Sequence, residues 1–117
     1  MGLVFYATQA NHEVVLEKLR GLAPDVRAHV GGKIRAAQDL DFQLGPPHLE
    51  RIRGDAYKGL SELRMPFRGE TYRLLLFRHG NTTVAVEFED KKGRKLPDHV
   101  LKTARARMID WRKRNPL

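Results

Sequence analysis

The sequence predicts one α+β domain spanning residues 1–117, in which helices pack on a small, mostly antiparallel sheet. Three strand-like segments follow one another closely at 60–65, 71–78 and 82–88, with turn residues between them. Segments with a helical spacing of apolar residues lie on both sides of this group. We therefore expect an N-terminal strand, two helices, a three-strand meander and a final helix.

The N-terminal segment predicts a strand followed by a helix. Residues 3–8 are apolar and rich in aromatic side chains, which is typical of a strand. Residues 10–22 place Val15, Leu19 and Leu22 at helical spacing. We expect this first helix to occupy the whole of the second segment.

A second helix is predicted to begin at Pro24, because proline suits the first helical turn. We expect it to extend to Leu44. Gly31 and Gly32 lie in its middle, where each glycine costs roughly 1 kcal/mol relative to alanine. They predict either a kink or a close packing contact. The apolar residues that this helix would bury are Val26, Val30, Ile34, Ala37 and Leu44.

The three segments of the meander differ in their patterns. Residues 71–78 are nearly all apolar, as expected for a central strand covered on both faces. In the strand before it, alternation places Leu63 and Met65 on one face and Glu62 and Arg64 on the other. Short turn-like connections link the segments, so the meander is antiparallel.

The connecting stretches are predicted as loops. The helical part ends at 45–47, and the chain from there to Asp55 reads as a loop. A charged loop follows the meander at 90–95. Pro97 then begins a final helix that extends to about Arg114.

The composition excludes several function classes. The chain has no cysteine, which removes disulfides, thiolate metal sites and cysteine nucleophiles, and which fits a reducing cytoplasm. No apolar run approaches the length of a membrane span, and the N-terminus lacks the features of a signal peptide. We expect a cytoplasmic protein with no membrane partner.

The distribution of charge indicates the kind of partner. The net charge is +8, and it lies entirely in the second half: residues 1–63 carry 8 Lys/Arg and 8 Asp/Glu, whereas residues 64–117 carry 14 and 6. A one-sided positive field attracts polyanions. Nucleic acid is the first candidate, followed by an anionic membrane surface and an acidic protein. The alternative is a basic surface with no partner.

Arg64 and Arg73 lie on neighbouring predicted strands. Arg73 has apolar neighbours, and burying an unpaired charge is costly, so its guanidinium requires an anionic partner. A phosphate suits the planar, bidentate guanidinium. A carboxylate of Glu62 or Glu87 across the sheet is an equally good alternative.

A basic cluster follows the last strand of the meander. It comprises Lys91, Lys92, Arg94 and Lys95, and His99 comes shortly afterwards in the first turn of the final helix. A charged run at this place is commonly a solvated loop, but here it would lie over the sheet face that displays the arginines. His99 is a candidate for proton transfer. The histidines show no metal-ligand spacing and no glycine-rich phosphate loop is present, so we expect no metal and no cofactor.

Four motifs in a fixed order, followed by a helix rich in alanine and arginine, carry a family resemblance. Residues 57–114 resemble the RelE/HigB superfamily of toxins, with the RelE/ParE fold, and especially its phage-derived HigB-like branch. The motifs are Gly59-Leu60-Ser61-Glu62-Leu63-Arg64, Tyr72-Arg73-Leu74, Phe88-Glu89-Asp90-Lys91-Lys92 and Lys95-Leu96-Pro97.

The resemblance implies the toxin of a type II toxin–antitoxin system, a metal-independent endoribonuclease that cleaves mRNA on the ribosome and inhibits translation. It implies a helix-turn-helix antitoxin as partner, through which the complex binds operator DNA. The residues it implies for catalysis are Arg64, Arg73, Lys91 and Lys92. The residues we expect to contact RNA are Lys58, Arg94, Lys95 and His99.

The implied mechanism uses the RNA 2′-OH as nucleophile against the adjacent phosphorus. Arg64 and Arg73 would hold the phosphate, and Lys91 or Lys92 would act as base if neighbouring cations lower its pKa. Lys95 or Arg94, with His99 as a further candidate, would protonate the leaving oxygen. This mechanism requires the two guanidinium groups to converge beside an open concavity. Guanidinium groups on opposite faces, or held in internal ion pairs with no open concavity beside them, would contradict it.

Two other functions remain compatible with the sequence. One is a ParE-like toxin, which shares the fold but poisons a topoisomerase and cleaves no RNA. The other is a nucleic-acid-binding module without catalysis, in which the basic residues only contact phosphates.

Overall fold

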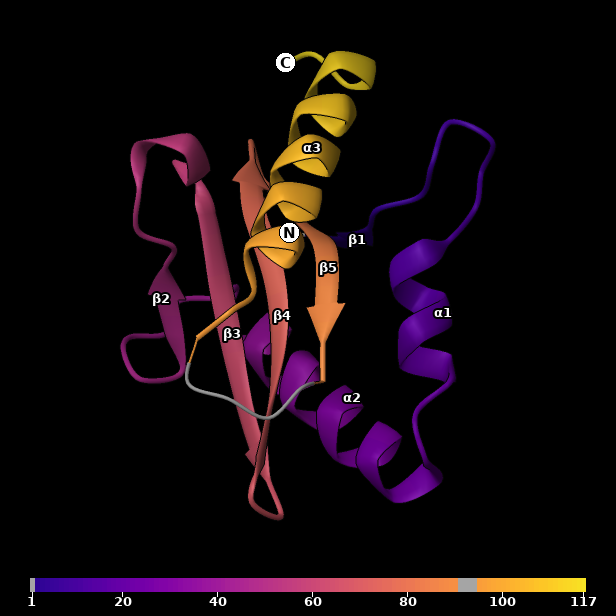
Figure 1. Ribbon diagram of the computed structural model, residues 1–117, viewed down its shortest axis with the longest axis vertical. Helices are drawn as coiled ribbons and strands as arrows, with labels where there is room; N and C mark the ends of the chain where they lie inside the picture. Colours follow the sequence, from indigo (N-terminus) through magenta and orange to yellow (C-terminus); the bar gives the residue numbers. More distant parts are fainter. Residues whose placement is uncertain (1, 91–94) are drawn as a thin grey trace.

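The α+β class predicted from the sequence is confirmed by the computed structural model, which describes residues 2–90 and 95–117 (Figure 1). Its described helices and strands, in chain order, are β1 (Gly2–Phe5), α1 (Val14–Arg20), α2 (Pro24–Asp39), β2 (Leu49–Arg51), the 3-10 helix η1 (Asp55–Tyr57), β3 (Leu60–Phe67), β4 (Glu70–His79), β5 (Thr82–Glu89) and α3 (Asp98–Arg114).

The described strands form one five-stranded sheet in the order β1-β5-β4-β3-β2. β1 pairs with β5 in parallel, and the other neighbours are antiparallel. The predicted meander is therefore present as β3, β4 and β5. β4 is central, and its side chains from Tyr72 to Phe77 are all buried, because both faces of this strand are covered.

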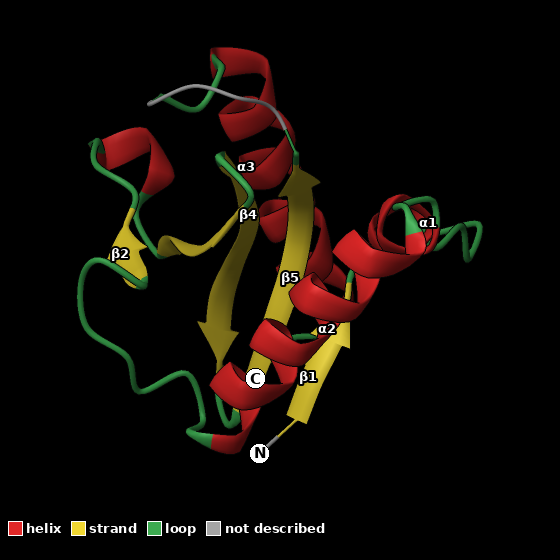
Figure 2. Cartoon of the chain, turned by 90° about the horizontal axis from the view of Figure 1, so that it is seen from below, coloured by secondary structure: helices red, strands yellow, loops and turns green. Residues whose placement is uncertain are grey.

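Helices cover both faces of the sheet. Figure 1 shows α3 in front of the upper part of the sheet and α2 behind it, and Figure 2 shows the sheet between these two helices from below. α3 packs on the face of Phe77, whose ring centroid lies 5.9 Å from that of Trp111 in edge-to-face geometry. The opposite face of the sheet packs against α2, which buries Val30, Ile34 and Ala37.

The first helix is shorter than predicted. It begins at Val14 rather than at residue 10, and it ends at Arg20. The chain before it forms a turn in which Thr8 Oγ1 accepts a hydrogen bond from the backbone N–H of His12, and Asn11 has φ of 64°. These local contacts give backbone groups of residues 8–12 hydrogen-bond partners outside a helix. This explains why α1 begins later than predicted.

The second helix begins at Pro24 as predicted but ends at Asp39, five residues before the predicted end. Asp41 and Phe42 adopt positive φ values of 52° and 56°, so the chain turns out of the helix there. Phe42 is buried, whereas Leu44 is only partly buried and belongs to the following loop.

The glycine pair within α2 does not serve the close packing contact that was one of the two predicted reasons for it. The helix continues through Gly31 and Gly32 without a break. A Cβ added at either position would meet no atom within 4 Å, so close packing does not require glycine there.

The predicted loop up to Asp55 contains a strand that the sequence did not indicate. β2 is only three residues long and pairs with β3 at the edge of the sheet. With β1, it raises the sheet to five strands.

The final helix confirms the prediction. Pro97 occupies the position before its first residue, and the helix extends from Asp98 to Arg114. Ala104 and Met108 are buried on its sheet-facing side. None of the described helices has the length and apolar character needed to cross a bilayer.

Candidate functional site

Arg64 and Arg73 are direct cross-strand partners in β3 and β4. Residues opposite each other in an antiparallel pair point to the same face of the sheet. Arg73 shares that face with Phe77, four positions along the strand, and Phe77 packs on α3. The arginine pair therefore lies on the α3 face, and both guanidinium groups belong to one side of the sheet.

The two arginines differ in their access to solvent. The side chain of Arg64 is 34% exposed, whereas that of Arg73 is 6% exposed. A position on the central strand explains the burial of Arg73, and a position closer to the sheet edge explains the exposure of Arg64. Of the pair, Arg64 is the one that an external anion reaches first.

The carboxylate of Glu62 lies between the two guanidinium groups. Its Oε1 accepts a hydrogen bond of 2.8 Å from Arg64 Nε and lies 2.7 Å from Arg64 Nη2. Its Oε2 lies 3.5 Å from Arg73 Nε. The alternative in which Glu62 pairs with Arg73 across the sheet is therefore present in the structure.

A second glutamate contacts Arg64 from the edge strand. Glu50 in β2 is the cross-strand partner of Glu62, and its Oε1 lies 3.4 Å from Arg64 Nη1. The sequence did not indicate this contact, because it predicts a loop for the segment that contains Glu50. Regular alternation over only three residues gives no strand signal.

Two further buried glutamates lie on β5. Glu87 Oε1 accepts hydrogen bonds of 2.9 Å from Lys18 Nζ and from the backbone N–H of Phe88, and it lies 3.3 Å from Arg107 Nη1. Glu89 is the cross-strand partner of Arg73. Carboxylates thus balance the cations on this part of the sheet.

The last strand of the meander ends beside the arginine pair. β5 ends at Glu89, directly opposite Arg73, so the chain leaves the sheet at this point. Of the predicted basic cluster, Lys91, Lys92 and Arg94 lie outside the described residues.

The two other predicted RNA-contacting residues near the start of α3, Lys95 and His99, are exposed. Lys95 is an exposed residue before α3. His99 is exposed in the first turn of α3, where its backbone carbonyl accepts a hydrogen bond of 2.8 Å from the Thr103 hydroxyl. Both side chains are accessible to a polyanion.

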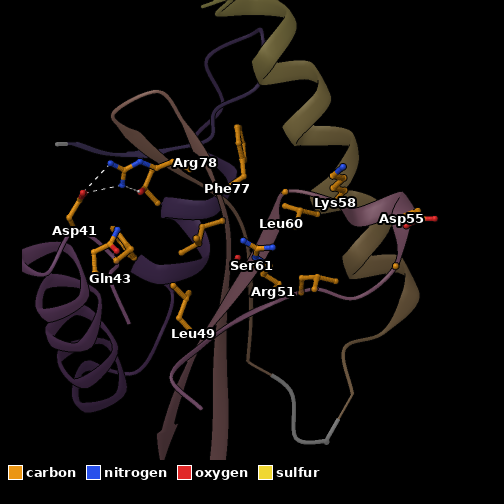
Figure 3. A pocket seen from close by; sticks show the side chains of 16 residues that line it. Asp41, Gln43, Leu49, Arg51, Asp55, Lys58, Leu60, Ser61, Phe77 and Arg78 are labelled. Atoms are coloured by element: carbon orange, nitrogen blue, oxygen red, sulfur yellow. Dashed lines mark hydrogen bonds and ion pairs between the residues drawn. The ribbon is translucent and has the colours of Figure 1, made fainter. Parts of the chain in front are cut away.

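Lys58 lies elsewhere. It lines a cavity of about 790 Å³ that extends from η1 to the loop after α2 (Figure 3). From the sheet, its wall includes two cross-strand pairs near the start of β3, Leu60 with Phe77 and Ser61 with Leu76. Neither Arg64 nor Arg73 lines this cavity. The structure therefore does not bring Lys58 together with the arginines.

An ion pair closes one side of this cavity. Arg78 donates hydrogen bonds of 2.9 and 3.0 Å to the two carboxylate oxygens of Asp41, as Figure 3 shows. These hydrogen bonds hold the pKa of Asp41 below its ordinary value. The pair joins β4 to the turn that follows α2.

Comparison with known protein families identifies the chain. Residues 17–109 match the model of the family described as phage derived protein Gp49-like (DUF891). The chain belongs to this family. The Gp49-like proteins are a family of RelE/HigB-like toxins. No curated protein matches the sequence.

In the Gp49-like chain, the matched residues include the sheet face just described. The match extends from α1 through β5 and most of α3, so it includes Arg64, Arg73 and Glu62. Within the described residues, no group of three or more His, Asp or Glu side chains is arranged to hold a metal ion. Among the residues that the structure describes, this face carries the guanidinium groups of Arg64 and Arg73 and the carboxylate of Glu62.

Proposed function

We propose that this Gp49-like chain is the toxin of a type II toxin–antitoxin system and a ribosome-dependent mRNA endoribonuclease. The observation that carries the proposal is the pairing of Arg64 with Arg73 on one face of the sheet. Two guanidinium groups side by side match the oxygens of a phosphodiester and the charge that develops in its transition state. The family membership and the net charge of +8 support the same conclusion.

The proposed reaction is an in-line attack by the RNA 2′-oxygen on the adjacent phosphorus. Lys91 or Lys92 takes the 2′-OH proton, the P–O5′ bond breaks, and a second group returns a proton to the 5′-oxygen. Lys95, Arg94 and His99 are the candidates for this acid. Arg64 and Arg73 stabilise the additional negative charge on the phosphate oxygens.

We propose that the ribosome orients the mRNA for cleavage. A site with few side chains gains most from a substrate that is already positioned, because orientation supplies a large part of the rate. We further propose a helix-turn-helix antitoxin as the partner that blocks the arginine face and that carries the complex to operator DNA. We place this reaction in the cytoplasm, where ribosomes translate mRNA.

One observation favours a second candidate, a ParE-like toxin that cleaves no RNA. Glu62 contacts both arginines and Glu50 contacts Arg64, so internal carboxylates occupy part of the proposed phosphate site. For the nuclease, a phosphate must bind beside these carboxylates or displace them. A toxin that acts by binding a protein has no such requirement.

Induced expression of the chain separates these functions. The nuclease predicts growth arrest with fragmented transcripts, the ParE-like toxin predicts arrest with intact transcripts and DNA damage, and a non-catalytic module predicts normal growth. Arg64→Ala should restore growth, whereas Arg35→Ala, which removes an exposed arginine from α2, should not. Arrest that persists in folded Arg64→Ala would contradict the assignment of the site.

A further inference from the structure

We propose that Glu62 is the positioning residue of the arginine pair: its carboxylate fixes both guanidinium groups in the orientation that grips a phosphodiester. This inference rests on the proposed nuclease function for its kinetic consequence. Its structural part, the shared carboxylate, can be measured without any activity. No contact between Glu62 and substrate is required.

The contacts of Glu62 with Arg64 define which side of the guanidinium stays available. Nε and Nη2 lie together on one edge of an arginine, and both are within 2.8 Å of Glu62 Oε1. The second edge, formed by Nη1 and Nη2, carries one N–H of each nitrogen, and Nη1 also donates a hydrogen bond of 3.4 Å to Glu50. Glu62 therefore anchors the inner edge of Arg64 and directs its outer edge away from the anchor, where a phosphate can bind in bidentate fashion.

The contact of Glu62 with Arg73 serves a different purpose. Like charges directly opposite each other on adjacent strands repel, and Arg64 and Arg73 are such a pair. The Glu62 side chain is 8% exposed and places a negative charge between them, with Oε2 3.5 Å from Arg73 Nε. Its Oε2 is buried without a hydrogen-bond donor within the described residues. The attraction between this oxygen and Arg73 is therefore electrostatic, and it acts in a weakly screened environment.

Glu50 offers a matched comparison on the neighbouring strand. It is the cross-strand partner of Glu62 and carries the same carboxylate, but its side chain is 36% exposed. It lies 3.4 Å from Nη1 of Arg64, and it forms an ion pair with no other arginine among the described residues. Removing the Glu50 charge should therefore leave the inner edge of Arg64 and the position of Arg73 unchanged.

The direct experiment observes the arginine side chains by NMR. In protein with ¹⁵N-labelled arginine, the Nε–H signals of Arg64 and Arg73 are compared among wild type, Glu62→Gln and Glu50→Gln. We expect Glu62→Gln to shift both signals and to accelerate the exchange of Arg64 Nε–H with water, because a charged acceptor is replaced by a neutral one. Glu50→Gln should alter neither. Unchanged signals in folded Glu62→Gln would overturn the inference.

A second variant covers the case in which Glu62→Gln does not fold. Glu62→Asp retains the charge but is one methylene shorter, so its carboxylate cannot keep both contacts. At least one of the two Nε–H signals must then shift. If neither shifts, Glu62 does not position the pair.

The kinetic consequence is tested with purified ribosomes programmed with mRNA. Glu62→Gln should lower kcat by roughly 10- to 100-fold with little change in KM, since it misdirects groups that act in the transition state. Glu17→Gln, which removes an exposed carboxylate of α1 paired with His12, should retain kcat. If wild-type protein cleaves nothing, the proposed function fails while the NMR result stands. If wild type cleaves and Glu62→Gln is equally active, the positioning role fails while the proposed function stands.

Discussion

Tyr6 donates a hydrogen bond of 2.6 Å to Asp110 Oδ2, which joins the chain after β1 to the last turns of α3 across 104 positions of sequence. Arg114 adds a contact of 2.7 Å to the same oxygen and donates another hydrogen bond to the backbone carbonyl of Ala7. These contacts fasten α3 to the edge of the sheet.

Removal of the Tyr6 hydroxyl should measure this connection. Tyr6→Phe keeps the buried ring but leaves Asp110 without its donor, so we expect the free energy of unfolding to fall by about 1–2 kcal/mol. Tyr57→Phe is the control, because the hydroxyl of Tyr57 makes no hydrogen bond within the described residues. Urea unfolding followed by circular dichroism provides the comparison. Equal midpoints for Tyr6→Phe and wild type would show that the hydrogen bond does not contribute.

Asp110 should make stability depend on pH in the acid range. The hydrogen bonds from Tyr6 and then from Arg114 lower the pKa of Asp110 below its ordinary value of 3.8. The folded state therefore favours the ionised carboxylate. This contribution is complete above about pH 4, the unfolded pKa, and is lost as the pH falls through the lowered folded pKa. Asp110→Asn should be less stable than wild type at neutral pH, and the difference should shrink in acid. A difference that stays constant with pH would contradict this assignment.

Glu87 joins three elements, and its charge should contribute to stability. It contacts Lys18 of α1, the backbone of β5 at Phe88, and Arg107 of α3. Glu87→Gln removes the negative charge that faces two cations, which keep their hydrogen bonds to the backbone carbonyls of Phe88 and Val86. Because the side chains of Lys18 and Arg107 are 51% and 20% exposed, water compensates in part. We therefore expect a loss of about 1–3 kcal/mol rather than the larger cost of a fully buried pair.

The control for this prediction is Glu17→Gln. Glu17 forms an exposed contact with His12, in which both side chains are more than half exposed. Surface pairs of this kind contribute little to stability. Thermal unfolding of both variants should therefore separate them. A loss for Glu17→Gln as large as that for Glu87→Gln would argue against a specific role of Glu87.

Alanine at either glycine of the α2 pair should stabilise the protein. Gly31→Ala and Gly32→Ala place a methyl group in open space on an exposed helix surface, and each should raise the free energy of unfolding by roughly 0.5–1 kcal/mol. Gly69→Ala is the matched control, since its site is equally open but has φ of +81°. That conformation disfavours alanine by about 1 kcal/mol. Destabilisation by Gly31→Ala would show a constraint on α2 that its packing does not reveal.

Alternation and turn residues were sufficient to predict the meander, and Pro97 was sufficient to predict the start of α3. The contrast of Leu63 and Met65 with Glu62 and Arg64 fixed the faces of β3, and the register of β3 with β4 confirms it. Element ends were predicted less well. The apolar spacing within α1 is correct, but the turn around Asn11 uses side-chain and backbone contacts that this spacing does not encode.

For the candidate site too, local sequence pattern predicted the strand faces but not the tertiary contacts. Alternation along two strands predicted that Arg64 and Arg73 could share a face, because strand parity is a local property. The contacts that hold them depend on register and on an edge strand of three residues, so the place of Glu50 beside Arg64 required the fold. Lys58 is close to Arg64 in sequence, but it lines a cavity that neither Arg64 nor Arg73 lines.

The central claim is that Arg64 and Arg73 grip one phosphodiester. It is tested most directly by a double-mutant cycle of Arg64→Lys and Arg73→Lys in mRNA cleavage on purified ribosomes. Lysine keeps the charge but loses the bidentate fork. If both arginines hold the same phosphate, the kcat/KM of the double variant should be only slightly below that of the less active of the two single variants. Losses that multiply fully, or cleavage that is unchanged in folded variants, would contradict the account.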